Sequence, residues 1–184
     1  MSKLLHKAAL FATRAHYGQD RKYTGEPYIV HPAQVATLAV QCGLSDEAVA
    51  AAWLHDVIED TKYTEEDLRK KFPAKVVDLV VELTDQSEGK GNRKKRKALE
   101  CKRLCKCSVE ARALKAIDLV SNMPSIAEHD TGFFKVFLEE MRAFRDAGLC
   151  EGLDEDLTSV FEDCFVRFGW YALLEGVSKG AKHD

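Results

Sequence analysis

Apolar residues recur at intervals of three and four positions along most of this 184-residue chain, which is the spacing of amphipathic helices. The first such stripe runs from Leu4 to Ala15 and stops near Gly18. Neither the two-residue alternation of a half-buried strand nor an internal repeat is evident. The chain is therefore predicted to be an all-α bundle of about eight helices.

Capping residues and helix breakers mark where the other helices begin and end. Pro32 suits the first turn of a helix that Gly43 ends. Ser45 can cap the next helix, which we expect to run to about Asp60. Further helices are expected from Thr64, Pro73 and Ser108, and over about residues 133–144 and 157–174.

Composition favours a single soluble domain in the cytosol. No run approaches the roughly 18 apolar residues of a membrane span, and the first residues lack the apolar core of a secretory signal. Six cysteines show no regular framework and are expected to remain thiols. Cys101, Cys105 and Cys107 lack a Cys-x-x-Cys pair, so zinc is only a minor alternative there.

The net charge of −3 conceals an uneven distribution. Residues 88–106 carry nine Lys or Arg against two Glu, a charge of +7, whereas residues 1–87 and 107–184 carry −3 and −7. The near-neutral total argues against a generic nucleic-acid binder. The basic segment nevertheless needs an explanation.

One octapeptide, residues 53–60, places four ionisable side chains in an otherwise apolar helix. At 100° per residue from His55, the side chain of Glu59 lies at about 40°, Asp56 at about 100° and Asp60 at about 140°. All four can face one cavity, where a divalent metal would offset the cost of gathering acids. The alternative is a solvated polar face with a salt-bridged histidine.

Two further residues favour the metal interpretation. His31 directly precedes Pro32 at a loop-to-helix junction, although a histidine there can also be an ordinary surface or capping residue. Asp118 lies in a strongly apolar helix, where an unpaired carboxylate is costly. Its alternative is a buried acid paired with Arg or Lys.

Three segments resemble, in order, the signature segments of the HD-domain metal-dependent phosphohydrolases. The likeness is closer to the (p)ppGpp hydrolase domain of RelA/SpoT proteins and to the stand-alone small alarmone hydrolases. The segments are Gly-Glu-Pro-Tyr-Ile-Val-His-Pro at 25–32, Leu-His-Asp-Val-Ile-Glu-Asp-Thr at 54–61 and Asp-Leu-Val-Ser-Asn-Met at 118–123. Because no synthetase segment follows, the likeness is to the hydrolase-only members. It implies one HD-type hydrolase domain over residues 1–184, with residues 129–184 as C-terminal helices completing the bundle.

The resemblance implies a metal site and a reaction. One divalent ion, usually Mn²⁺ in this family, would be held by His31, His55, Asp56 and Asp118. Glu59 and Asp60 match the acidic pair that orients and deprotonates water or assists the leaving group. The implied reaction is hydrolysis of the 3′-pyrophosphate of (p)ppGpp to GDP or GTP and pyrophosphate.

The same resemblance implies substrate contacts. Arg21 and Lys22 match a basic pair near the nucleobase, and Asn122 and Ser125 match positions that contact ribose and the 3′-phosphates. Solvated loop residues and a helix C-cap are the alternatives. The last segment departs from the family pattern at Ile117, Leu119 and Pro124. Pro124 disfavours helical geometry at Met123 and could end the helix there.

Three interpretations of the basic run Arg93–Lys97 and its continuation stay open. It can be a phosphate collar for a substrate with four or five phosphates, an RNA patch, or a solvated helix face. No aromatic residues interleave with it, which counts against single-stranded RNA. The expected partner is thus a small nucleotide with several phosphates. We expect the protein to bind neither a membrane nor nucleic acid, and the sequence does not determine its oligomeric state. The alternative functions are hydrolysis of another nucleotide, such as (p)ppApp or NADPH, and a non-catalytic nucleotide-binding module.

Overall fold

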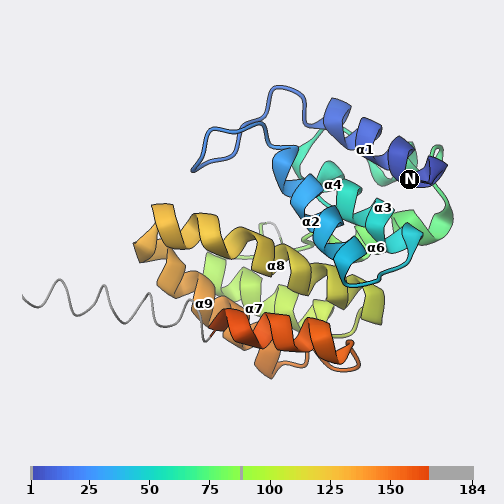
Figure 1. The fold of residues 1–184 in the computed structure, drawn as a ribbon. Coiled ribbons are helices and arrows are strands. Elements are labelled where there is room, and N and C mark those ends of the chain that lie inside the picture. Colours follow the sequence, from blue (N-terminus) through green and yellow to red (C-terminus); the bar gives the residue numbers. More distant parts are fainter. Residues whose placement is uncertain (1, 88, 166–184) are drawn as a thin grey trace, which may run out of the picture.

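The computed structural model describes residues 2–87 and 89–165, and this part of the chain is built from helices without a β-strand (Figure 1). The all-α prediction is confirmed. The helices are α1 (Lys3–Ala15), α2 (Val30–Gln41), α3 (Asp46–Leu54), α4 (Val57–Asp60), α5 (Glu65–Arg69), α6 (Ala74–Leu83), α7 (Arg93–Leu104), α8 (Val109–His129) and α9 (Thr131–Asp146). Residues 155–165 are also helical, and the predicted continuation over residues 166–174 lies outside the described residues.

The predicted capping residues begin the helices as expected. The side-chain oxygen of Ser45 accepts a hydrogen bond from the backbone N–H of Ala48, and Ser108 does the same for Ala111. Thr64 forms a complete capping box with Asp67. Each cap satisfies backbone donors that would otherwise lack partners at a helix start.

The prediction of one continuous helix from Ser45 to Asp60 is wrong. Helix α3 ends at Leu54, and α4 begins at Val57, with Asp56 at φ −94° and ψ −2° between them. The imidazole Nδ1 of His55 lies 2.7 Å from the carbonyl oxygen of Ala52, the acceptor that the Asp56 amide would use in a continuous helix. The break changes the angles at which the following acids project.

Two other segments, the basic stretch and the segment around Pro124, are helical in the structure. The basic stretch is itself a helix, α7, whose first turn is capped by Asn92. Helix α8 continues through Pro124 to His129 rather than ending near Met123. The whole last signature segment, residues 118–123, and the residues that follow Pro124 therefore lie on one helix.

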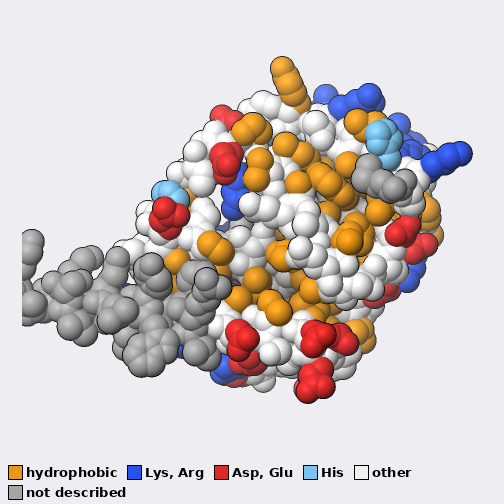
Figure 2. Space-filling model, in the orientation of Figure 1, with side chains coloured by type: hydrophobic (Ala, Val, Ile, Leu, Met, Phe, Trp, Pro, Cys, Tyr) orange, Lys and Arg blue, Asp and Glu red, His pale blue; other side chains and the backbone are white. Residues whose placement is uncertain are grey.

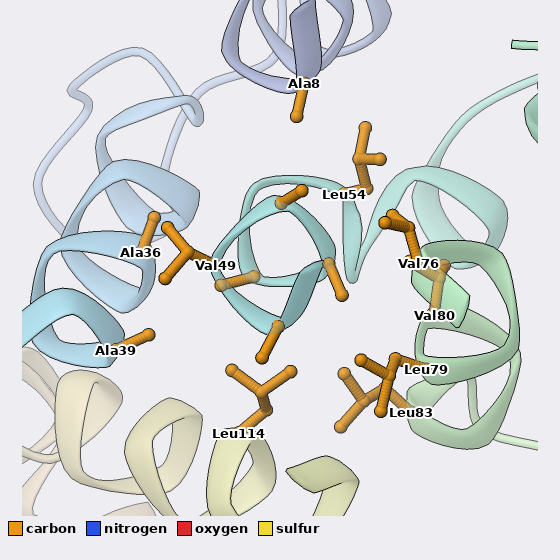
Figure 3. Packing of buried hydrophobic residues seen from close by; sticks show 14 of the residues in the cluster. Ala8, Ala36, Ala39, Val49, Leu54, Val76, Leu79, Val80, Leu83 and Leu114 are labelled. Atoms are coloured by element: carbon orange, nitrogen blue, oxygen red, sulfur yellow. The ribbon is translucent and has the colours of Figure 1, made fainter. Parts of the chain in front are cut away.

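Helix α3 forms the centre of the main core. Its residues Ala48, Val49, Ala50, Ala51, Ala52 and Leu54 are at most 3% exposed. Figure 3 shows α3 nearly end-on, with side chains from α1, α2, α6 and α8 pointing toward it, among them Ala8, Ala36, Val76 and Leu114. Small side chains on every face of α3 let four helices approach it closely.

Helix α8 joins this core to a second one. Leu114 and Ile117 pack in the α3 core, whereas Leu119 and Met123 pack with the apolar residues of α7, α9 and the segment 155–165. In Figure 1, α8 lies between the helices α1–α6 above it and the α7–α9 layer below it. Residues on α8 can therefore meet residues from the ends of α2 and α3.

Charged side chains are unevenly distributed over the face of the molecule seen in Figure 2. Figure 2 shows acidic side chains gathered along the lower edge of the face seen in Figure 1 and basic ones at the upper right, over α1. None of the helices in the described ranges has the length and apolar character needed to cross a membrane.

The packing around α3 yields a stability prediction. Ala51→Leu adds an isopropyl group at a fully buried position, and we expect the free energy of unfolding to fall by about 1–3 kcal/mol because the core must be overpacked. Ala98→Leu makes the same change on the exposed side of α7 and should alter it by less than about 0.5 kcal/mol. Urea denaturation of both variants is the measurement, and equal losses would contradict the central role of α3.

Candidate metal centre

His31 reaches the site from the first turn of α2. The residue is 3% exposed, and its backbone N–H donates to the carbonyl of Tyr28 in the turn that starts the helix. Pro32, the next residue, is buried within the same turn. The imidazole is therefore held by a rigid helix start rather than by a free loop.

His55 and Asp56 enter from the break between α3 and α4. The contact between His55 Nδ1 and the Ala52 carbonyl places one ring proton on Nδ1, so Nε2 is the nitrogen that faces Asp56 and Asp118. Burial disfavours a charged ring, but these two carboxylates raise the pKa of His55 to about 9, so a metal that binds there must displace the Nε2 proton. This Nε2 atom is buried and lacks a well-oriented hydrogen-bond partner among the described residues. A lone pair in that position is what a metal ligand requires.

Four predicted ligand residues converge on one point. His31 Nε2 lies 3.1 Å from Asp118 Oδ1 and 3.7 Å from Asp56 Oδ2, while His55 Nε2 lies 3.8 and 3.0 Å from the same two atoms. Metal–ligand bonds of about 2.1 Å place neighbouring ligand atoms about 3.0 Å apart at right angles and about 3.4 Å apart in a tetrahedron. The observed separations match the spacing around one divalent cation.

The tightest part of this cluster is His31, His55 and Asp118, whose ligand atoms lie within 4.8 Å of one another. Over residues 2–87 and 89–165 it is the one group of three or more possible ligands with that spacing. The cysteines near residue 101 form no such group in the described part of the chain. Cys101 Sγ instead donates to the carbonyl of Ala143, 3.3 Å away.

Asp118 is also paired with a lysine that the sequence reasoning did not single out. Lys115 Nζ lies 2.8 Å from Asp118 Oδ2, and Asn122 Nδ2 donates to Asp118 Oδ1 over 2.8 Å. Burial opposes the charge of Asp118, but Lys115 and the two histidines outweigh it and hold the pKa of Asp118 well below its usual range. The carboxylate thus turns one oxygen to Lys115 and the other to the imidazoles. The three-residue spacing of Lys115 and Asp118 on a helix was the available signal.

Tyr28 is a second residue that the sequence reasoning left unassigned. Its hydroxyl lies 2.6 Å from Asp56 Oδ2 and 3.1 Å from Asp60 Oδ2. Burial, followed by the charges of the two aspartates, raises the pKa of the phenol far above its ordinary value. The hydroxyl therefore keeps its proton and donates to carboxylate.

The acidic pair Glu59 and Asp60 lies on α4, next to the cluster. Glu59 Oε2 accepts a hydrogen bond from the backbone N–H of Asp85 at 3.1 Å. Burial raises the pKa of both acids, and the Asp56 carboxylate raises it further. Carboxyl groups with raised pKa values are suited to exchange protons near neutral pH.

A cavity of about 620 Å³ lies between α2, α8 and the loop that precedes α2. Arg21 and Ser125 line it, and the guanidinium of Arg21 contacts Gln34 Oε1 at 3.1 Å and Asn122 Oδ1 at 3.4 Å. Three of the four predicted substrate residues therefore lie together. Lys22 does not join them, because its ammonium lies 3.1 Å from the Tyr23 hydroxyl and 3.9 Å from Asp130 Oδ2.

The basic helix α7 is divided between two surroundings. Arg93 makes two hydrogen bonds to the carboxylate of Glu140 on α9, at 2.7 and 2.8 Å. Lys97 Nζ lies 3.7 Å from Asp85 Oδ2, and the backbone N–H of Asp85 contacts Glu59. Lys97 thus connects to the acidic pair through one residue, whereas Arg93 is engaged elsewhere.

Comparison with known proteins places this chain among the HD-domain proteins. The sequence model of the family described as HD domain matches residues 8–132. A guanosine-3′,5′-bis(diphosphate) 3′-pyrophosphohydrolase of Haemophilus influenzae is 55% identical over 71 residues, which are 39% of this chain and 10% of that protein. A probable enzyme of the same name from Mycoplasma pneumoniae is 35% identical over 133 residues, 67% of this chain and 18% of that protein. The chain therefore spans less than a fifth of the length of these two curated relatives.

A solved structure has nearly the same extent as this chain. It is that of a metazoan ortholog of SpoT, described as hydrolysing ppGpp and playing a role in starvation responses. The two structures agree with a TM-score of 0.82 at 26% sequence identity, over 92% of this chain and 97% of the other.

The Lys115–Asp118 pair yields a prediction that separates its effect from that of a metal. In EDTA, Lys115→Met should lower the free energy of unfolding by about 3 kcal/mol because a buried carboxylate loses its cation. Saturating Mn²⁺ should reduce this loss, since a divalent cation on Asp118 Oδ1 compensates the missing charge.

Lys97→Met is the matched control, because its partly exposed ion pair should contribute no more than about 1 kcal/mol under either condition. Urea denaturation with EDTA and with Mn²⁺ is the measurement. A loss for Lys115→Met that is identical in both conditions would show that no metal binds at Asp118.

Proposed function

The chain belongs to the HD-domain family, and from that premise we propose that it is a metal-dependent (p)ppGpp 3′-pyrophosphohydrolase. The substrate class is guanosine tetra- or pentaphosphate, and the products are GDP or GTP and pyrophosphate. The relatives named above, one of them solved over nearly the same extent of chain, support this choice of substrate.

The convergence of two imidazoles and two carboxylates from three separate chain segments carries the proposal. His31, His55, Asp56 and Asp118 would hold one divalent ion, which we propose to be Mn²⁺. Imidazole and carboxylate are suitable ligands for such an ion, and four protein ligands leave coordination positions open. When bound, the ion would polarise a phosphoryl oxygen and lower the pKa of water.

Glu59 and Asp60 would carry the proton transfers. A carboxylate close to the metal can orient the attacking water and accept its proton, and a protonated carboxyl can donate to the leaving oxygen. Both residues are exposed on α4, and desolvation by their neighbours, followed by the negative charge of Asp56, raises the pKa of each side chain, which favours a carboxyl group that can both take up and release a proton.

The cavity beside α8 would receive the nucleoside. The Arg21 guanidinium can stack on a purine, while Asn122 and Ser125 offer hydrogen-bonding groups to the ribose and the 3′-phosphates. Lys22 is highly exposed, and reaching a phosphate requires it to leave Asp130. We retain it as a substrate contact through its ammonium charge.

A second candidate keeps the metal centre and changes the nucleotide. Val120, Ser121 and Pro124 line the nucleoside cavity, so the signature segment that departs most from the family forms its wall. The Oγ atoms of Ser121 and Ser125 are buried without a hydrogen-bond partner among the described residues. A nucleotide such as (p)ppApp or NADPH, whose base or phosphates satisfy these hydroxyls better, would then be the preferred substrate.

We propose residues 1–184 as a single hydrolase domain to which residues 129–184 contribute C-terminal helices. A cytosolic location remains part of the proposal.

The central experiment measures hydrolysis by the purified chain with Mn²⁺ and, separately, ppGpp, ppApp and NADPH. Pyrophosphate release from ppGpp is expected, and His55→Ala or Asp56→Ala should lower kcat/KM by more than about 100-fold, since even residues behind metal ligands cost 10- to 100-fold. His6→Ala is the control, because His6 is exposed on α1. Full turnover by both ligand variants would refute the metal site, and faster turnover of ppApp or NADPH would favour the second candidate.

The basic run yields a separate prediction about substrate binding. Neutralising Arg93–Lys97 should weaken binding of the polyphosphate more than binding of the metal. Lys97 is the residue of this run that we expect to cause the effect, because it lies near Asp85 beside the acidic pair whereas Arg93 is bound to Glu140. Lys97→Gln should raise KM for ppGpp about fivefold, or ~1 kcal/mol, without changing the Kd for Mn²⁺. Lys102→Gln removes the same charge from an exposed position further along α7 and should leave KM unchanged. Equal effects of the two variants would support the solvated-face interpretation.

A further inference from the structure

Tyr28 touches two acids to which the proposed reaction gives different tasks. Asp56 Oδ2 is one of the proposed metal-ligand atoms, and Asp60 belongs to the proposed acidic pair. The Tyr28 hydroxyl lies 2.6 Å from the first and 3.1 Å from the second. A single phenol oxygen thus bridges the metal-binding carboxylate and the acid beside it.

The ring of Tyr28 is held so that its hydroxyl has little freedom. It packs against His16, with ring centroids 4.9 Å apart, and lies edge-on to His31 at 6.0 Å. The backbone N–H of Tyr28 donates to the Gln19 carbonyl at 2.8 Å, and its carbonyl accepts from His31 at 2.9 Å. Both the ring and the backbone are therefore fixed before any ligand binds.

Tyr28 also closes the loop that carries Arg21. Asp20 and Pro27 form an isolated antiparallel bridge, and Arg21 N–H donates to the Glu26 carbonyl at 2.8 Å. The loop appears between α1 and α2 in Figure 1. Residues 19–28 thus form one closed unit with Arg21 facing the nucleoside cavity and Tyr28 facing the acids.

A second bond links the same unit to α4. Gln19 Nε2 donates to the backbone carbonyl of Asp60 at 2.7 Å, and Gln19 Oε1 lies 2.7 Å from His16 Nδ1. Asp60 is therefore held through its side chain by Tyr28 and through its backbone by Gln19. Two independent contacts from one loop fix the position of this acid.

We propose that Tyr28 is a positioning residue that sets the distance between the metal-binding carboxylate of Asp56 and the catalytic carboxyl of Asp60. This inference rests on the proposed function. The bridge holds the Asp60 carboxyl beside Asp56 and keeps Asp56 Oδ2 turned toward the imidazoles, where it would serve as a metal ligand. Partners that orient metal ligands from behind affect both metal affinity and turnover.

A positioning role for Tyr28 predicts different kinetic effects of removing its hydroxyl than a purely structural role does. A tyrosine that only packs would affect the stability of the chain when its hydroxyl is removed and leave the active protein unchanged. A tyrosine that contacts substrate would affect KM. A positioning tyrosine should affect kcat and metal affinity while KM stays constant.

Tyr28→Phe is the test, because it removes the hydroxyl and keeps the ring that packs on His16. The expected results are a kcat for ppGpp about 10- to 100-fold lower at saturating Mn²⁺, a KM within twofold of wild type, and a Kd for Mn²⁺ raised about tenfold. The Kd is measured by calorimetric titration of Mn²⁺ without nucleotide. Thermal unfolding followed by circular dichroism shows that the variant is folded.

Tyr63→Phe is the matched control. Tyr63 packs on Phe11 with ring centroids 4.8 Å apart, and its hydroxyl makes no hydrogen bond within residues 2–87 and 89–165. The same chemical change there should leave kcat, KM and the Kd for Mn²⁺ at wild-type values.

The outcomes separate this inference from the proposed function. Wild-type kcat and Kd in Tyr28→Phe would overturn it, as would a rise in KM alone. If the wild-type chain binds Mn²⁺ and does not hydrolyse ppGpp, the proposed function fails, and the Kd of the variant still decides whether Tyr28 orients Asp56.

Discussion

Alanine side chains at positions 48, 50, 51 and 52 allow other helices to pack closely around α3, and this burial fixes where α3 lies in the core. A helix enclosed in this way cannot shift along or about its axis without opening the core. His55 and Asp56 follow its last residue, Leu54, so the packing of the core sets their positions. The start of α2 and the middle of α8 pack on the same helix, and they bring His31 and Asp118 to the same point.

Gathering these groups has an electrostatic cost that the surrounding residues only partly offset. Asp56, Glu59, Asp60 and Asp118 lie close together, with Asp118 buried, Asp56 partly buried and the other two exposed, and like charges at such short range repel one another. Lys115 neutralises one side of Asp118, and Tyr28 donates to Asp56 and Asp60. A divalent cation among the four ligand atoms would offset the remaining charge. The arrangement is therefore most stable when such an ion is bound, which couples folding to metal binding.

Helix α8 connects the candidate metal centre to the cavity proposed to receive the nucleoside. One face of the helix supplies Asp118, one turn later Asn122 contacts Arg21, and Ser125 lines the cavity. Pro124 does not interrupt this sequence of contacts, because the helix continues to His129. Its second face packs on α7 and α9, so the basic helix is fixed to the same support. The departures of the last signature segment thus change the wall of the cavity rather than the course of the helix.

Local sequence determined much of this protein. Helix starts at Ser45, Thr64 and Ser108 were predictable because a side chain caps a backbone a few positions away. The ligand types were predictable because histidines and acids are costly in apolar segments. Tertiary structure alone decided which distant atoms meet: His31 with Asp118, Tyr28 with Asp56 and Asp60, and Arg21 with Asn122 while Lys22 turns to Asp130. These outcomes depend on packing between segments up to about a hundred positions apart, and neither propensity nor spacing along the chain carries that information.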